Sequence, residues 1–383
     1  HTSSLILRLI MMTTASLSSC QIADMNLKKL TFPTISEAFC LVDNFRQNSF
    51  SEHCDLILKE FDVDEMASPI DLKFHIRNSF IIPTTIVKFC PFPQFDYIYK
   101  VFSLTNEQFR ILIPETKNKY PFIIQDYIHS EAVQGDTIEN PQYWIASLIA
   151  FAIAFRCSDL HSNNVIVRNG KPWFIDAETL FQWGWTSPRN IAEYLSERIV
   201  QSDMGSLIKK WQNEAGNAKS LVYNDDFIKQ IDCAILHFIE IRQTISPPIF
   251  TKLRFINTPG LIKLKKLFSN SGSDFLINIL QQGPEILPLA DSCHYLLSYD
   301  FIVSYCAERL VSGYIPQIFS ECSTGNIFGT TNETVKYLGK ISGAPPLLQC
   351  NEFEYRWKQL SQSVRINKLH ESLENIKLLG DYP

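Results

Sequence analysis

Two short polar clusters lie close together in the sequence and contain the residue types needed for metal-dependent phosphoryl transfer. Asp159, His161 and Asn164 form the first cluster, and Asp176 and Glu178 form the second. Enzymes of the kinase type use a loop carboxylate to orient the attacking hydroxyl, an Asn five positions later to bind a metal ion, and a further Asp to hold metal ions on the triphosphate. The types and spacing of these residues therefore predict this chemistry.

A predicted β-hairpin separates the two clusters. Residues 165–167 and 173–175 are rich in β-forming side chains, and the dipeptide Asn169-Gly170 lies between them. Asn-Gly is a strong signal for a tight hairpin turn, so the hairpin would return the second cluster to the side of the first. The alternative interpretation is a surface hairpin whose polar residues are only solvated. The combined pattern within so short a stretch favours a functional site.

Each polar side chain has a predicted role. Asp159 would orient or deprotonate the acceptor hydroxyl, while Asn164 and Asp176 would bind Mg²⁺ that bridges the phosphates of ATP. His161 would hold the loop or contact phosphate, or else pack against the hairpin without a chemical role. Glu178 lies two residues after Asp176, so in an extended segment both side chains point the same way. It would be a further metal ligand or support one.

These residues also carry a family resemblance. The stretch DLHSNNVIVRNGKPWFIDAETLF, residues 159–181, resembles the core of the dehydratase domain of class II lanthipeptide synthetases. The segment RLVSGYIPQIF near residue 313 is a weaker match, and the similarity spans about residues 95–330. The resemblance implies a stand-alone, shortened dehydratase domain without the cyclase domain. It also implies an ATP- and Mg²⁺-dependent enzyme that phosphorylates Ser or Thr of a peptide or protein and then eliminates the phosphate.

The resemblance implies an α+β fold with the two lobes of a protein or lipid kinase. We expect an N-terminal helical segment over residues 1–62 and a small β-rich lobe over 63–130. A helical lobe with the catalytic and metal-binding loops would follow over 131–245, and a further helical region over 246–383. The apolar run at 141–155 predicts a buried central helix that leads the chain to Asp159.

The nucleotide-binding part is less complete. Lys100, in the apolar run FDYIYKVF, is the first candidate for a strand Lys that contacts phosphate, with Lys88 second; each is alternatively a solvent-facing Lys. Glu107 would form an ion pair with Lys100, and Asp126 would lie in the hinge that joins the two lobes. No glycine occurs before residue 135, which excludes a Gly-rich phosphate loop there. The nucleotide cradle would therefore differ, or the chain would be an inactive kinase.

The resemblance also implies residues for the elimination step. In the family an Arg and a Thr six residues apart act in a basic segment after the kinase core. Here Lys252 and Thr258 have that spacing, with Arg254 between them. Cationic side chains would stabilise the leaving phosphate. The alternative is a cationic turn between helices.

Composition limits the other possibilities. The 383-residue chain has a net charge of -5, which argues against a nucleic-acid binder, and its ten Cys form no CxxC pair. We expect reduced thiols, a cytoplasmic location with export to another compartment or a host cell left open, and no membrane span. Three hypotheses remain: a phosphotransferase with phosphate elimination, a kinase acting on a protein or small molecule without elimination, and a pseudokinase scaffold.

Overall fold

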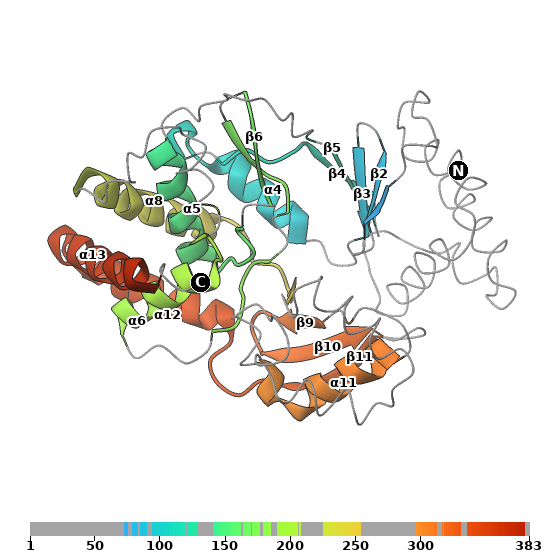
Figure 1. The fold of residues 1–383 in the computed structure, drawn as a ribbon. Helices are drawn as coiled ribbons and strands as arrows, with labels where there is room; N and C mark the ends of the chain where they lie inside the picture. The colour runs from blue at the N-terminus through green and yellow to red at the C-terminus, as the bar shows by residue number, and fades with distance from the viewer. Residues whose placement is uncertain are drawn as a thin grey trace, which may run out of the picture. The chain divides into compact units, whose positions relative to one another are not determined.

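The computed structural model describes the backbone of about half of the chain (Figure 1). The described residues are 73–75, 79–82, 85–89, 94–109, 111–119, 122–126, 128, 141–161, 164–169, 171–176, 179–184, 190–205, 207, 225–253, 296–311, 316, 318–330 and 335–379. The predicted N-terminal helical segment and the site candidates Glu178, Arg254 and Thr258 lie outside these residues. The chain forms two compact units, one of residues 1–93, 114–127 and 329–336 and the other of the remaining residues.

The first unit contains an antiparallel sheet of five strands. These are β1 (Lys73–His75), β2 (Ser79–Ile82), β3 (Thr85–Phe89), β4 (Thr116–Lys119) and β5 (Phe122–Asp126), in the spatial order β1-β2-β3-β5-β4. The long β3–β5 pairing runs from Thr85 opposite Asp126 to Phe89 opposite Phe122. The predicted β-rich character of this part of the chain is confirmed.

One predicted strand is wrong. The run FDYIYKVF forms helix α4 (Gln94–Leu104), and the short 3-10 helix η2 (Glu107–Phe109) follows it. Tyr97, Ile98, Val101 and Phe102 are buried, while Lys100 is exposed. Apolar residues at positions i, i+1, i+4 and i+5 share one face of a helix but not of a strand, and burial of that face determines the outcome.

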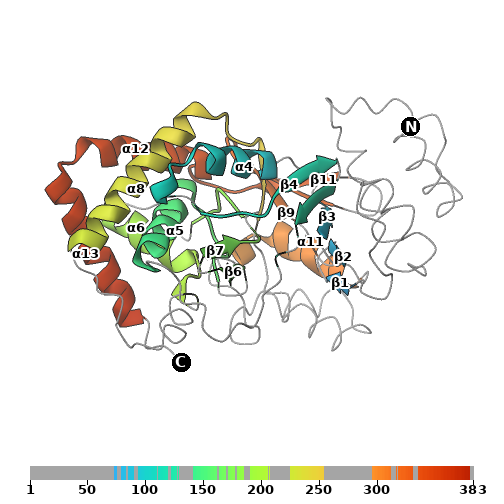
Figure 2. The same cartoon turned by 90° about the horizontal axis from the view of Figure 1, so that it is seen from above.

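The second unit is built around helix α5 (Pro141–Phe155), which confirms the predicted buried central helix. Every residue from Ile145 to Phe155 is at most 2% exposed. Helices α6 (Ile191–Gln201), α8 (Asp225–Thr244) and α12 (Pro346–Gln359) contact α5, and α13 (Gln362–Leu379) packs on α6 and α8 (Figure 2). A helix that is apolar on all sides needs neighbours on all sides, and these helices supply them.

Aromatic side chains fill the space around α5. The ring of Phe151 lies 5.1 Å from those of Phe102 and Phe155 and 5.7 Å from that of Phe238 on α8. Such edge-on and tilted ring pairs each contribute roughly 0.5–1.5 kcal/mol beyond the area they bury. The end of α5, from which the candidate catalytic loop leaves, is therefore held in a tightly packed core.

The region expected to be helical after residue 246 contains a second sheet. Strands β8 (Phe250–Lys252), β9 (Ile318–Glu321), β10 (Asn326–Thr330) and β11 (Val335–Lys340) lie in the order β11-β10-β9-β8. Helix α11 (Asp300–Val311) follows the 3-10 helix η5 (Leu296–Ser298) and packs against this sheet, where a Cβ on Gly339 would lie 2.8 Å from the ring of Phe301. The region does contain the helices α11, α12 and α13, but the sheet was not predicted, because its strands are short and β8 pairs with β9, which is distant in sequence.

Within the described part of the chain, no helix has both the length and the apolar character that crossing a membrane requires.

Candidate active site

The hairpin between the two polar clusters forms as predicted. Strand β6 (Val165–Arg168) pairs with β7 (Lys171–Phe174), and Asn169 in the turn has a φ of 53°. Asn tolerates this left-handed backbone region better than most residues. Beyond the last strand pair, the Ile175 N–H donates to the Asn164 carbonyl at 2.9 Å. The hairpin therefore brings Asn164 and Asp176 to its open end.

Asn164 also ties together the two ends of the candidate catalytic loop, which begins at Ser158 and ends at Asn164. Its side-chain nitrogen donates to the Asp159 carbonyl at 2.8 Å, and its backbone N–H donates to the His161 carbonyl at 2.9 Å. Asn164 is 8% exposed, so its amide has little freedom to turn. Because the amide nitrogen is engaged with the loop, the Oδ1 oxygen is the atom with which Asn164 can bind a cation.

Asp159 adopts an unusual backbone conformation. Its φ is 67°, a region that non-glycine residues seldom occupy and that occurs often at functional sites. The carboxylate is largely buried and lies 3.2 Å from His161 Nε2. Of the two predicted roles for His161, this contact favours holding the loop, because the imidazole orients the carboxylate proposed to receive the acceptor hydroxyl.

A segment after Asp176 anchors the catalytic loop. Thr179 Oγ1 donates to the Ser158 carbonyl at 2.6 Å, and the Ser158 N–H donates to the Thr179 carbonyl at 3.1 Å. The N–H groups of Phe181 and Gln182 donate to the carbonyls of Phe155 and Arg156 at 2.9 and 3.0 Å. The sequence did not predict these bonds, because nothing in the type or spacing of the residues marks a pairing over more than twenty positions.

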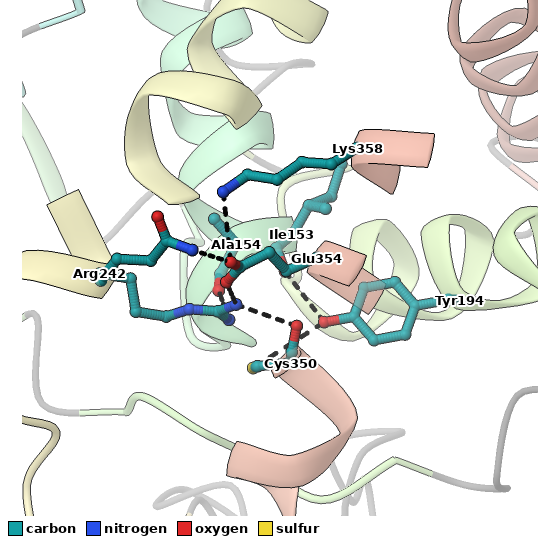
Figure 3. A network of polar contacts seen from close by, with 8 residues as sticks. Ile153, Ala154, Tyr194, Arg242, Cys350, Glu354 and Lys358 are labelled. Carbon is teal, nitrogen blue, oxygen red and sulfur yellow. Dashed lines mark hydrogen bonds and ion pairs between the residues drawn. The ribbon is translucent and has the colours of Figure 1, made fainter. Parts of the chain in front are cut away.

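Buried polar side chains complete the end of α5 (Figure 3). The Tyr194 hydroxyl donates to the Ile153 carbonyl at 3.1 Å, and Arg242 Nη1 donates to the Ala154 carbonyl at 2.8 Å. The last carbonyls of a helix have no partner within the helix, so groups from elsewhere must satisfy them. Burial raises the pKa of the Tyr194 hydroxyl, which keeps it protonated and able to donate.

Two buried arginines lie close to residues 179–182, the segment that anchors the loop. Arg156 and Arg198 have 0% and 1% of their surface exposed, and Arg156 Nε donates to the Gln182 carbonyl at 2.8 Å. Burial, followed by repulsion from Arg156, lowers the pKa of Arg198 to about 10. The Glu197 carboxylate lies 3.2 Å from Arg198 and offsets part of this positive charge.

Lys252, the first of the predicted elimination residues, is linked to the same segment. It lies at the end of β8, and its carbonyl accepts from Gln182 Nε2 at 2.8 Å. The chain thus brings Lys252 next to the residues that anchor the catalytic loop, although seventy positions separate Lys252 from Gln182.

The predicted nucleotide-contacting residues have a different setting from the one expected. The strand context that favoured Lys100 is absent because Lys100 lies on the exposed face of α4, and Glu107 lies, exposed, in η2. Lys88, the second candidate, is in strand β3, and Asp126 ends strand β5 with its side chain exposed.

The residues present fit magnesium held jointly with phosphate. Within the described ranges, no group of three or more His, Cys, Asp or Glu side chains could enclose a metal ion. Mg²⁺ in phosphoryl-transfer enzymes typically takes only one or two protein oxygens, its remaining ligands being waters and substrate phosphates. Asn164 Oδ1 and the half-buried Asp176 carboxylate, at the open end of one hairpin, match that requirement.

Part of the chain is similar to a known protein family. No curated protein matches the sequence. Residues 95–215 match a family model described as Domain of unknown function (DUF4135). The matched range begins in α4 and ends after α6, so it contains Asp159, Asn164 and Asp176 and leaves out Lys252. The candidate site residues Asp159, Asn164 and Asp176 therefore lie within the range that is similar to this family.

Proposed function

We propose that this protein is an ATP- and Mg²⁺-dependent phosphotransferase, similar to the dehydratase domain of class II lanthipeptide synthetases, that phosphorylates Ser or Thr of a peptide or protein. The observation that carries the proposal is the pair of bonds made by Asn164. Its side chain donates to the Asp159 carbonyl, and its own carbonyl accepts from Ile175, next to Asp176. One residue thus links the proposed catalytic loop to the proposed metal ligand.

The electrostatics of the site suit phosphoryl transfer. Catalysis of this reaction depends mainly on positioning and on neutralising the charge of the phosphates. Magnesium held by Asn164 and Asp176 would supply positive charge at the phosphates. Asp159 is almost fully buried and held by His161, so its carboxylate is oriented before a hydroxyl binds. Less reorganisation is then needed when the hydroxyl attacks.

The β-rich unit supports a kinase-like architecture. Its five antiparallel strands all precede α5 and the helices packed on it, as a small lobe precedes a large lobe, although α4 lies between β3 and β4 in the chain. Lys88 lies in a strand of this sheet, which is where protein kinases carry their phosphate-contacting Lys. We therefore infer that Lys88, rather than Lys100, contacts the nucleotide, within a cradle that contains no Gly-rich loop.

Phosphate elimination is proposed as a second step. In this step a base takes the proton from Cα of the phosphorylated residue, the released electron pair forms the Cα=Cβ double bond, and the Cβ–O bond breaks so that phosphate leaves as the anion. Lys252, with Arg254 and Thr258 after it, would stabilise the leaving phosphate. The bond from Gln182 to the Lys252 carbonyl supports this role, because it joins the cationic segment to the anchor of the catalytic loop. A kinase without this second step is the alternative.

Magnesium-dependent ATP binding and turnover test the proposal. Wild-type protein should bind ATP in calorimetry only when Mg²⁺ is present and should release phosphate slowly without an acceptor. Asp176→Ala removes a metal ligand and should lower turnover by about a hundredfold or more. Asp226→Ala is the matched control, because its carboxylate is exposed and contacts Lys229 on the same helix. Absence of Mg²⁺-dependent ATP binding by the wild type would contradict the proposal and favour a scaffold.

A pre-phosphorylated Ser or Thr peptide separates the two enzymatic alternatives. Conversion to the dehydro residue, detected as loss of phosphoric acid by mass spectrometry, would establish elimination, and Lys252→Ala should abolish it. An unchanged phosphopeptide alongside normal ATP turnover would leave the kinase-only function.

A further inference from the structure

The segment of residues 179–183, called here the bridging segment, makes hydrogen bonds on two sides. Toward the catalytic loop it exchanges two bonds with Ser158 and donates two further bonds to the end of α5. Toward the second sheet, Thr251 Oγ1 on β8 donates to the Leu180 carbonyl at 2.5 Å, and Gln182 Nε2 donates to the Lys252 carbonyl at 2.8 Å. The same short segment therefore contacts two parts of the chain that are distant in sequence.

The bonds toward the sheet involve Thr251 on β8, Ser320 opposite it on β9, and Lys252, which follows Thr251. Thr251 on β8 lies opposite Ser320 on β9, and both side chains are 0% exposed. Trp183 Nε1 donates to Ser320 Oγ at 3.0 Å, next to the bond that Thr251 makes to Leu180. Thr251 and Ser320, which lie opposite each other in the sheet, thus bond Leu180 and Trp183 of the bridging segment.

Because the bridging segment is buried, the loss of any one of these hydrogen bonds should disturb it. Thr179, Gln182 and Trp183 are each at most 4% exposed. Water cannot readily replace a lost partner there, and a buried polar group without a partner is costly. A shift of β8 would therefore move the bridging segment, and the segment would move the loop that begins at Ser158.

We propose that Thr251 and Gln182 are positioning residues, through which the bridging segment couples the location of Lys252 to that of the Asp159 loop. The role of this coupling in catalysis rests on the proposed function. It would hold Lys252 at a fixed position relative to the Asp159 loop while one substrate residue is first phosphorylated and then loses its phosphate. Neither residue needs to contact the substrate.

Amide hydrogen exchange on the whole protein tests the coupling without requiring activity. Thr251→Val removes a hydroxyl at nearly constant shape, and Gln182→Met removes both amide donors. Each should speed exchange of the Ser158, Phe181 and Gln182 amides by about tenfold, although none of those amides bonds to residue 251 or to the side chain of residue 182. Thr251→Ser keeps the hydroxyl and should restore wild-type exchange. Thr244→Val is the control, because its hydroxyl bonds within α8 to the Ile241 carbonyl.

Two results would overturn the coupling. One is wild-type exchange at these three amides in both variants. The other is equal acceleration throughout α5 and α8, which would indicate general destabilisation. Where the wild type turns over Mg²⁺-ATP, Thr251→Val should lower kcat with little change in KM, and Thr251→Ser should recover it. A wild type without turnover would contradict the proposed function, while the exchange result would still decide the coupling.

Discussion

Asn164 illustrates how much of this site depends on single side chains. Its amide bonds the Asp159 carbonyl, its carbonyl accepts from Ile175, and its remaining oxygen can take a metal ion. An Asp at this position would place a carboxylate oxygen against the Asp159 carbonyl and lose the donated bond. The residue type is therefore required by the loop as well as by the proposed metal.

Gly325 should be intolerant of a side chain. Its φ is 77°, and a Cβ there would lie 2.9 Å from the Trp183 ring. Gly325→Ala should lower the free energy of unfolding by about 1–3 kcal/mol, measured by urea denaturation. Gly205→Ala is the control because a Cβ at Gly205 meets nothing within 4 Å. Equal effects of the two substitutions would contradict the close packing around Trp183.

His237 should contribute a pH dependence to stability. Burial lowers its pKa below the ordinary value of 6.5, with an opposing contribution from Glu240, and its Nε2 accepts from the Asn106 N–H at 3.0 Å. The unfolded chain then binds the proton more readily than the folded protein. Stability from this group is complete above about pH 6.5 and is lost as the pH falls through the folded pKa.

His237→Gln keeps an acceptor that does not titrate. Urea denaturation between pH 7.5 and pH 5 should therefore show a smaller loss of unfolding free energy for this variant than for the wild type. If the variant showed the same pH dependence of the unfolding free energy as the wild type, groups other than His237 would be responsible for it.

At the scale of elements, the end of α5 is held by partners from two other helices. Arg242 on α8 donates to the carbonyls of Ala154 and Cys350 and to the Glu354 carboxylate, and Tyr194 on α6 donates to the Ile153 carbonyl (Figure 3). Lys358 and Gln243 also contact Glu354. This network fixes α5 immediately before the catalytic loop starts.

Arg242→Met should therefore be costly. The Arg242 side chain is 4% exposed, and its removal leaves two carbonyls and the Glu354 carboxylate with fewer partners. We expect a loss of about 3–5 kcal/mol in unfolding free energy. Arg356→Met is the matched control: it removes a half-exposed Arg from α12, the helix that carries Glu354, where Arg356 pairs with Glu352, and should cost only about 0.3–0.5 kcal/mol. Similar losses for both variants would argue against a special role for the Arg242 network.

At the scale of the whole molecule, the proposed chemistry belongs to the unit built on α5. Asp159, Asn164, Asp176 and Lys252 all lie in that unit, whereas Lys88 and Asp126 lie in the unit of the β1–β5 sheet. The family match covers the first three of these residues.

The local sequence was sufficient to predict the hairpin and the buried helix α5. An Asn-Gly turn between two β-rich runs and an apolar stretch of helical length act over about twenty residues, where short-range preferences dominate. The link between Asn164 and the Asp176 side of the hairpin followed from the same local rules. For this reason the central part of the candidate site was predictable.

Only the tertiary structure decided the rest. FDYIYKVF has the composition of a strand, yet its buried face made it a helix and removed the argument for Lys100. The second sheet pairs Thr251 with Ser320, and the bridging segment joins Gln182 to Lys252 and Trp183 to Ser320. Such bonds join residues 70 to 137 positions apart, and no local pattern encodes them. They form because buried polar groups need hydrogen-bond partners within the protein.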